Sequence, residues 1–396
     1  MNGLSQKRYL ELPFPTEDDP RSDQQRILDS LAAAGVEERV HIPVHILREL
    51  SPLLDNAKWK ITVSLAWNGE NWEMVEIEEG DTTAQHYGLA VDLGSTTVVA
   101  RLLDCNSEEI LEEVSCFNKQ IQWGTDILSR IFYCKDNKEK LEEVRRATVE
   151  SICECMDKLD ASLEMQGTSS EKKAENNGVS ESGDDRGAKN AAKKARTISQ
   201  SALSMVIAGN TTMIHFLLGM DAFCVFYTPH AVHADRPDFL LARDLDIPLK
   251  GYVYCYPAKS NYLGGDIISG MIDTELYKQD EISVFFDIGT NGELVIGNKE
   301  FLLCGAGAAG PALEGGVVRT GMRAEDGAVD QVKIRNGNIY VHVIGNYEED
   351  SGSHEKNLGN HEDDSSGEAP RGICGSGIID LIAELFLEGW IDIRGK

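Results

Sequence analysis

The stretch "GLAVDLGSTTVVARLLD", Gly88 to Asp104, sets a short polar turn between two runs of apolar, largely β-branched residues. A second stretch, "SVFFDIGTNGELVIGN", Ser283 to Asn298, repeats the same order of apolar run, aspartate, apolar residue, glycine, small polar residues and apolar run. Apolar runs that flank a glycine-containing turn are typical of β-hairpins. The sequence therefore predicts two hairpins of one kind at distant positions in the chain.

Each predicted hairpin carries groups that suit a phosphate and its metal ion. A strand presents a carboxylate, Asp92 or Asp287, near a turn whose glycine lets the backbone approach a ligand. Backbone N–H groups and hydroxyls can donate hydrogen bonds to phosphate oxygens, and Mg²⁺ between carboxylate and phosphate offsets their repulsion. Asp92 and Asp287 are therefore candidate catalytic residues and magnesium ligands. The candidate phosphate-binding residues are Gly94, Ser95, Thr96 and Thr97 in the first hairpin, and Gly289, Thr290, Asn291 and Gly292 in the second.

An Asp-x-Gly turn on its own can be no more than a tight turn between two strands. A third element of the sequence argues against this simpler interpretation. The segment "VIAGNTT", Val206 to Thr212, predicts a strand and a turn at the start of a helix, where backbone N–H groups attract anions. Gly209, Asn210 and Thr211 are its candidate contacts. Three such turns in one chain favour a nucleotide site over isolated tight turns.

The composition argues against several classes of function. The net charge of −28 disfavours sequence-independent binding to nucleic acid or to an anionic membrane surface. No apolar run approaches the roughly 20 residues that span a bilayer. The 9 cysteines are scattered without a C-x-x-C pair, which indicates reduced thiols in a cytoplasmic protein. A zinc or iron–sulfur site built from this chain alone is therefore not expected.

Hydrophobic periodicity predicts an α/β chain in three parts. Residues 1–85 predict a small α+β domain, with a helix in "RSDQQRILDSLAAAGV" and a hairpin formed by "KITVSLAW" and "WEMVEIEEG". Residues 86–281 and 282–396 each begin with three predicted strands, and the chain ends in a helix, "CGSGIIDLIAELFLEGW", that is apolar on most sides and expected to be mostly buried. Two polar stretches, about 166–199 and about 346–370, are predicted to loop out, the first as a disordered insertion.

The order of the three turns resembles the ASKHA superfamily of acetate and sugar kinases, heat-shock chaperones and actin. Motifs over most of residues 87–396 resemble one branch more closely, the ATP-dependent reductive activators of corrinoid proteins; residues 1–85 resemble their middle region. These motifs are "GLAVDLGSTT", "GTDILSRI", "VIAGNTTMIHFLLG", "GGDIISG", "FFDIGTNGELVIGN", "GAGAAGPALEGG", "GMRAEDGAV" and "RGICGSGIIDLIAELF". The resemblance implies two ribonuclease-H-like subdomains that close on ATP and Mg²⁺.

The resemblance also implies an activity. In such activators, ATP binding and hydrolysis drive one electron from a two-iron two-sulfur centre to the cobalt of a cob(II)alamin protein, which restores cob(I)alamin for methyl transfer. Full-length members carry a ferredoxin-like domain and a C-terminal glycine-rich adenosine motif, and neither is recognised here. The second subdomain is therefore expected to be incomplete, as in a fragment, a split gene product or one half of a two-chain enzyme. Expected partners are a corrinoid protein, an iron–sulfur electron donor, and a second copy or a complementing chain.

Four further positions have two interpretations each. Glu314 either orients a hydrolytic water or is a carboxylate on a helix surface, and Asp266 either caps a helix or lies beside a metal. Gly375 and Ser376, in "CGSG", either contact a phosphate or base at a helix N-terminus or permit close helix packing.

Two alternative functions remain beside the activase core. The chain can be a non-catalytic module that binds a partner protein, or a small-molecule kinase of the same superfamily. Hydrolysis of ATP by the chain itself would favour the activase core over the non-catalytic module. The second lacks a sugar-specific or acid-specific motif, and superfamily membership does not identify a substrate.

Overall fold

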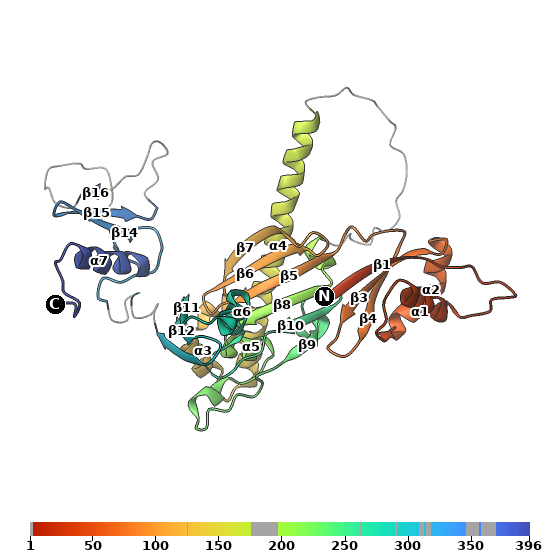
Figure 1. Cartoon of the computed structure of the whole chain (residues 1–396), viewed down its shortest axis with the longest axis horizontal. Helices are drawn as coiled ribbons and strands as arrows, with labels where there is room; N and C mark the ends of the chain where they lie inside the picture. The colour runs from red at the N-terminus through yellow and green to blue at the C-terminus, as the bar shows by residue number, and fades with distance from the viewer. Residues whose placement is uncertain are drawn as a thin grey trace. The chain divides into compact units, whose positions relative to one another are not determined.

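The computed structural model describes residues 3–124, 126–175, 197–261, 263–289, 291–308, 313, 318–345, 356–357 and 370–396. The chain forms two compact units, Met1–Glu275 and Leu276–Lys396. Figure 1 shows the elements of each unit.

The N-terminal domain is a 4-stranded sheet in the order β1-β3-β4-β2 with two helices. Its elements are β1 (Ser5–Glu11), α1 (Asp23–Ala33), β2 (Val40–His41), α2 (Val44–Asn56), β3 (Lys60–Trp67) and β4 (Trp72–Glu79). The expected helix and the β3–β4 hairpin are confirmed. Sequence analysis missed β1 and α2, although α2 buries Ile46, Leu50 and Leu54 at a four-residue spacing that is typical of a helix face.

The rest of the first unit is built on a 6-stranded sheet in the order β7-β6-β5-β8-β10-β9. The strands β5 to β7 are antiparallel neighbours, β8 is parallel to β5, and β10 is parallel to β8. The strands are β5 (Tyr87–Leu93), β6 (Thr97–Asp104), β7 (Glu109–Phe117), β8 (Ser204–Gly209), β9 (Asp238–Leu241) and β10 (Tyr252–Cys255). Three antiparallel strands followed by parallel ones are the ribonuclease-H-like arrangement that the sequence predicts.

Helices pack against this sheet, and short 3₁₀ turns lie between the elements (Figure 1). The long helix α4 packs against β6, β7 and α5 through a buried apolar stripe. The α-helices are α3 (Ile127–Cys134), α4 (Lys138–Glu175), α5 (Thr211–Leu217) and α6 (Gly265–Thr274). The 3₁₀ turns are η1 (Lys119–Trp123), η2 (Ser199–Ser201), η3 (Phe223–Phe226) and η4 (Ala242–Leu245). No helix of the described segments is long and apolar enough to cross a membrane.

The first polar stretch is more ordered at its ends than predicted. Helix α4 continues through residue 175, and residues 199–201 form η2, so the expectation of disorder over 166–199 is wrong at both edges. Adding residues to a helix that packing has already nucleated costs little, and the last five residues of α4, EKKAE at 171–175, have good helix propensity. Residues 176–196 lie outside the described residues.

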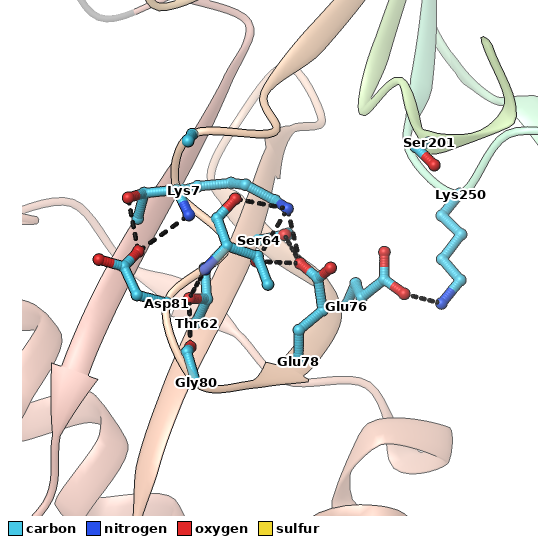
Figure 2. Close-up of polar contacts among 12 residues, drawn as sticks. Lys7, Thr62, Ser64, Glu76, Glu78, Gly80, Asp81, Ser201 and Lys250 are labelled. Carbon is cyan, nitrogen blue, oxygen red and sulfur yellow. Dashed lines mark hydrogen bonds and ion pairs between the residues drawn. The ribbon is translucent and has the colours of Figure 1, made fainter. Parts of the chain in front are cut away.

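The N-terminal domain is joined to the 6-stranded sheet by an apolar cluster with polar contacts around it. The cluster consists of Ala66, Val75 and Leu203, with Tyr252 packed against it. Lys250 Nζ lies 2.5 Å from Glu76 Oε1 (Figure 2). Deeper in the joint, Ser5 Oγ lies 2.9 Å from His86 Nε2 and 3.4 Å from Ser204 Oγ. The domain is thus packed against the strands that lead to the predicted nucleotide turns.

The second unit contains two separate sheets. A 3-stranded sheet, β11-β12-β13, confirms the second set of predicted strands, and a 4-stranded sheet has the order β16-β15-β14-β17. The elements of the first are η5 (Leu276–Lys278), β11 (Ser283–Ile288), β12 (Asn291–Gly297) and β13 (Leu302–Ala308). Those of the second are β14 (Ala328–Arg335), β15 (Asn338–Val343), β16 (Lys356–Asn357), β17 (Gly372–Ile373) and α7 (Gly375–Leu387). Apart from β16 and residue 370, the second polar stretch lies outside the described residues.

The final helix, α7, is less buried than its composition predicts. Gly377 and Ile378 are its buried residues within the described structure. The exposed apolar residues of this helix are Ile379, Ile382, Phe386 and Leu387. A helix that packs on one sheet, here against β14, buries only one stripe of its surface. The expectation of a mostly buried helix is therefore wrong for the described part of the chain.

Two carboxylates of α7 satisfy backbone groups along β14. Glu384 Oε2 accepts a hydrogen bond from the Ile334 N–H at 2.9 Å, and Asp380 Oδ2 accepts one from the Val332 N–H at 3.3 Å. The hydrogen bond from Ile334 and the Lys333 ammonium hold the pKa of Glu384 below its usual value. The helix thereby covers N–H groups that a bare strand edge would leave open to another chain.

The buried His86 makes the joint of the first unit sensitive to acid. Burial, and next the charge of Lys7, lower the pKa of His86 below its ordinary value of 6.5. The folded chain binds this proton less readily than the unfolded chain, so stability that is complete above about pH 6.5 is lost as the pH falls.

We expect the free energy of unfolding, measured by denaturant titration, to decrease between about pH 7.5 and about pH 5.5. The decrease should be smaller in His86→Gln, because the amide cannot take up a proton. His41→Gln, at an exposed histidine of β2, is the control and should keep the wild-type slope. Equal slopes in all three proteins would show that His86 is not the titrating group.

Candidate functional site

The first predicted hairpin lies at the end of β5. The strand pairs in parallel with β8, so that Asp92 is opposite Ala208 and Leu93 is opposite Gly209. A Cβ atom on Gly94 would lie 2.3 Å from the Thr97 carbonyl oxygen, which no side chain tolerates. The turn is therefore tight, and it requires glycine at its first position.

The polar side chains of this turn differ in exposure. Asp92 and Thr97 are exposed, Thr96 is half-buried, and Ser95 is only 7% exposed. Asp92 and Thr97 are thus open to a ligand through their side chains, whereas Ser95 offers mainly its backbone. All four expected residues after Asp92 lie in this one turn or at its exit.

The connector turn follows β8 and lies next to the first hairpin through the strand pairing. Asn210 is the N-cap of α5, and its Oδ1 accepts a hydrogen bond from the Met213 N–H at 3.0 Å. Thr211 is 1% exposed, and its hydroxyl donates to the Ser260 carbonyl at 2.6 Å. In this structure, both side chains stabilise the turn, so a ligand at the connector would meet Gly209 and the backbone.

The start of α6 closes against the connector. A Cβ atom on Gly264 would lie 2.4 Å from the Asn210 Cα atom, so glycine permits this approach. The N-cap of α6 is Gly264, and Asp266 lies in the first turn, where its Oδ1 accepts from the Ile267 N–H at 2.8 Å. The expectation that Asp266 is the N-cap is wrong by two positions, because the paired glycines move the helix start toward the connector. Hairpin, connector and α6 thus meet at one end of the sheet.

The second hairpin carries two carboxylates. Asp287 in β11 is directly opposite Glu293 in β12, and directly opposite residues of antiparallel strands project to one face. Glu293 is 9% exposed, and burial raises the pKa of Asp287 above 3.8. Two carboxylates so placed repel each other unless a cation or proton lies near them. This turn therefore favours a cation, and Glu293 is a residue that sequence analysis missed.

The structure describes some of the remaining candidate residues of the second unit and leaves others outside the described ranges. Gly289 follows β11, and Gly292 pairs with Ile288 within the hairpin. The backbone of Asn291 begins β12. Thr290, Glu314 and most of "GAGAAGPALEGG" lie outside the described residues.

In the first turn of α7, one glycine, Gly377, is required for close packing of the helix. A Cβ atom on Gly377 would lie 2.4 Å from the Val329 carbonyl oxygen, so close packing on β14 requires that glycine. Gly375 and Ser376 begin the helix; Ser376 is exposed, and its hydroxyl lies 3.1 Å from Cys374 Sγ. Gly375 and Ser376 stay candidates for a ligand contact.

Sequence analysis also missed two residues behind the first hairpin, Asn118 and Arg130. Both side chains are fully buried and donate hydrogen bonds to backbone carbonyls of the turn. A signal was present for Arg130, since an arginine beside Ile131 on the apolar face of a short helix is unusual without a partner.

The described oxygen donors fit Mg²⁺ bound together with a phosphate. No group of three or more His, Cys, Asp or Glu side chains in the described ranges is placed to hold a metal ion. Mg²⁺ does not need such a group, because it commonly takes one or two carboxylates, with phosphate oxygens and water as its other ligands. Asp92 is exposed, and Asp287 with Glu293 offers a second carboxylate site.

The thiols do not fit an iron–sulfur cluster, which takes four cysteine ligands. The closest thiols, Cys116 and Cys155, have sulfur atoms 3.3 Å apart, and both are buried. Burial raises the pKa of Cys155 to about 12, which makes its thiolate costly to form.

A ribonuclease-H-like sheet with a carboxylate hairpin at its end, followed by a second hairpin of the same kind, defines an ASKHA-type fold. The chain belongs to the RACo family, and three regions of that family match it in order. Residues 1–84 match the RACo linker region, not the middle region that the sequence suggested. Residues 87–173 and 184–279 match the RACo middle region. Residues 281–396 match the C-terminal domain of RACo, the ASKHA domain.

The individual proteins to which the chain is similar have names that refer to the activation or reduction of corrinoid proteins. The chain is 30% identical over 312 residues to the corrinoid activation enzyme RamQ of Eubacterium limosum, covering 78% of this chain and 43% of that protein. It is 30% identical over 137 residues to the [Co(II) methylated amine-specific corrinoid protein] reductase of Methanosarcina barkeri, covering 34% of this chain and 25% of that protein. A solved reductive activator for corrinoid, iron–sulfur protein is 32% identical, with a TM-score of 0.73, and the match covers 100% of this chain and 55% of that one. The chain thus spans about half the length of RamQ and of the solved reductive activator.

The tight turn after β5 yields a direct test. Gly94→Ala should distort the hairpin and destabilise the first unit by about 1–3 kcal/mol, the usual cost of forcing extra volume into a packed site. The control is Gly305→Ala in β13, where a Cβ atom would meet nothing within 4 Å. Thermal unfolding of both variants checks this, and equal melting temperatures would contradict the close contact at Gly94.

Proposed function

We propose that this chain is the ATP-binding core of a reductive activase that drives the reduction of cob(II)alamin to cob(I)alamin in a corrinoid methyl-transfer protein. One observation carries the proposal: in a chain of the RACo family, the first hairpin, the connector and the start of α6 meet at one end of the sheet. The names of the relatives support corrinoid proteins as the partner class.

In this proposal, the backbone N–H groups of the hairpins bind the phosphates of ATP. Asp92 is the proposed Mg²⁺ ligand of the first unit, and Asp287 with Glu293 is a separate carboxylate site proposed for the second unit. The ion would neutralise phosphate charge when bound. Phosphoryl transfer to water needs mainly positioning and electrostatic stabilisation, so rigid turns that present N–H groups suffice for most of the catalysis. Glu314 stays a candidate for orienting the attacking water.

The electron must come from outside this chain. An iron–sulfur donor on another domain or protein gives up one electron, and Co(II) becomes Co(I), which balances the step. The proposed partners are therefore a corrinoid protein, an iron–sulfur donor, and a second copy or complementing chain. All 9 cysteines are free, which supports a reducing compartment such as the cytoplasm.

The test is thermal unfolding of the chain with and without excess Mg·ATP. A ligand at about 100 times its dissociation constant stabilises the folded state by roughly 2.7 kcal/mol, so a clear rise in melting temperature is expected. Asp92→Asn and Asp287→Asn should each reduce the rise. Without ligand, Asp287→Asn should be at least as stable as wild type, because it removes a half-buried charge opposite Glu293.

The matched control is Glu300→Gln, an exposed carboxylate between β12 and β13, which should keep the full ATP response. A native chain whose melting temperature does not respond to Mg·ATP would contradict the proposal and favour a non-catalytic binding module. Phosphate release from ATP that depends on an added sugar or acid would instead favour a small-molecule kinase.

A further inference from the structure

The motif "GTDILSRI" marks the family, yet its residues have no part in the proposed contacts with ATP. The structure places its arginine, Arg130 of α3, directly behind the first hairpin. Asn118, just before η1, lies beside the same turn. Both side chains have 0% of their surface exposed, so neither can touch a nucleotide.

Three successive backbone carbonyls of the hairpin turn are held by these two residues. Asn118 Nδ2 donates to the Gly94 carbonyl at 2.9 Å, and the Asn118 N–H donates to the Thr96 carbonyl at 2.8 Å. Arg130 Nη1 donates to the Ser95 carbonyl at 2.6 Å. The inner side of the turn is thus fully engaged with the protein.

The planar peptide bond turns this inner anchoring into an outer binding surface. In a trans peptide, the C=O of one residue and the N–H of the next point in opposite directions. Fixing the carbonyls of Gly94, Ser95 and Thr96 inward therefore directs the N–H groups of Ser95, Thr96 and Thr97 to the other side. Successive N–H groups that point the same way form a site for an anion.

Arg130 itself is rigidly fixed. Its Nε donates to the Gly124 carbonyl at 2.9 Å, and its Nη1 also lies 3.2 Å from Gln120 Oε1. Gln120 in turn donates to the Thr148 hydroxyl on α4. A planar guanidinium with donors in a fixed fork suits three acceptors at once, whereas a lysine ammonium does not reproduce this fork. Its buried positive charge also lies on the carbonyl side of the turn, where low dielectric strengthens its attraction for an anion.

We propose that Arg130 and Asn118 are positioning residues for phosphate binding: they hold the peptide groups of the first hairpin so that the N–H groups of Ser95, Thr96 and Thr97 face the phosphates of ATP. This inference rests on the proposed function, since it assigns these residues to the same site. It predicts that their loss weakens phosphate binding in a chain that still folds.

The experiment measures the dissociation constants of Mg·ATP and Mg·tripolyphosphate by calorimetry in wild type, Arg130→Lys and Asn118→Ser. Serine keeps the cap that Asn118 provides to η1 but lacks the Nδ2 donor. Each variant should bind both ligands about tenfold more weakly, the equivalent of ~1.4 kcal/mol, while retaining a cooperative melting transition. Tripolyphosphate is included because it reports on the phosphate site without an adenosine contribution.

The matched control is Arg145→Lys on α4, where the arginine pairs with Glu142 and Asp246, and it should bind like wild type. Wild-type affinity in both folded variants would overturn the positioning role while leaving ATP binding intact. Failure of both variants to fold would also overturn it, because the residues would then serve the fold alone. If wild type binds neither ligand, the proposed function fails, and this inference fails with it.

Discussion

The parallel pairing of β5 with β8 is the constraint on which the first unit depends. It places Leu93 opposite Gly209, and so sets the first hairpin and the connector side by side although more than a hundred residues separate them in the chain. The approach of Gly264 to Asn210 then adds the start of α6 to the same end of the sheet. The ligand site proposed at this end would depend on strand register, because a shift by one residue would turn Asp92 to the other face.

The turns at this site are stiff because buried polar groups are satisfied in pairs. Carbonyls of the first hairpin accept from Asn118 and Arg130, the Thr211 hydroxyl donates to Ser260, and Asn210 caps α5. The side chains of Asn118, Arg130 and Thr211 are buried, so removing the partner of any of them would leave an unsatisfied buried group at a cost of about 1–3 kcal/mol. The N-terminal domain packs against the opposite ends of the same strands through Ser5 and His86, which links it to the site through β5.

Local sequence patterns predicted most elements near the site. The apolar runs around Asp92 and Asp287 and the glycine-containing turns each identified an element that the structure contains. Predictions that depended on what lies around an element were less successful. The burial of α7, the N-cap role of Asp266 and the two edges of the insertion predicted over 166–199 were each wrong, because burial, helix starts and helix ends are decided by neighbouring elements.

From the sequence alone follow the α/β class, the two carboxylate hairpins, the connector and the resemblance to corrinoid activators, since these depend on residue types at short spacing. Only the tertiary structure brought Arg130 and Asn118 behind the first hairpin and set Glu293 against Asp287. The physical reason is that a carboxylate beside a glycine-containing turn can be recognised from a sequence segment of about ten residues. A buried donor that orients that turn, or a charge opposite it, is defined by distances across folded strands and helices, which sequence spacing does not contain.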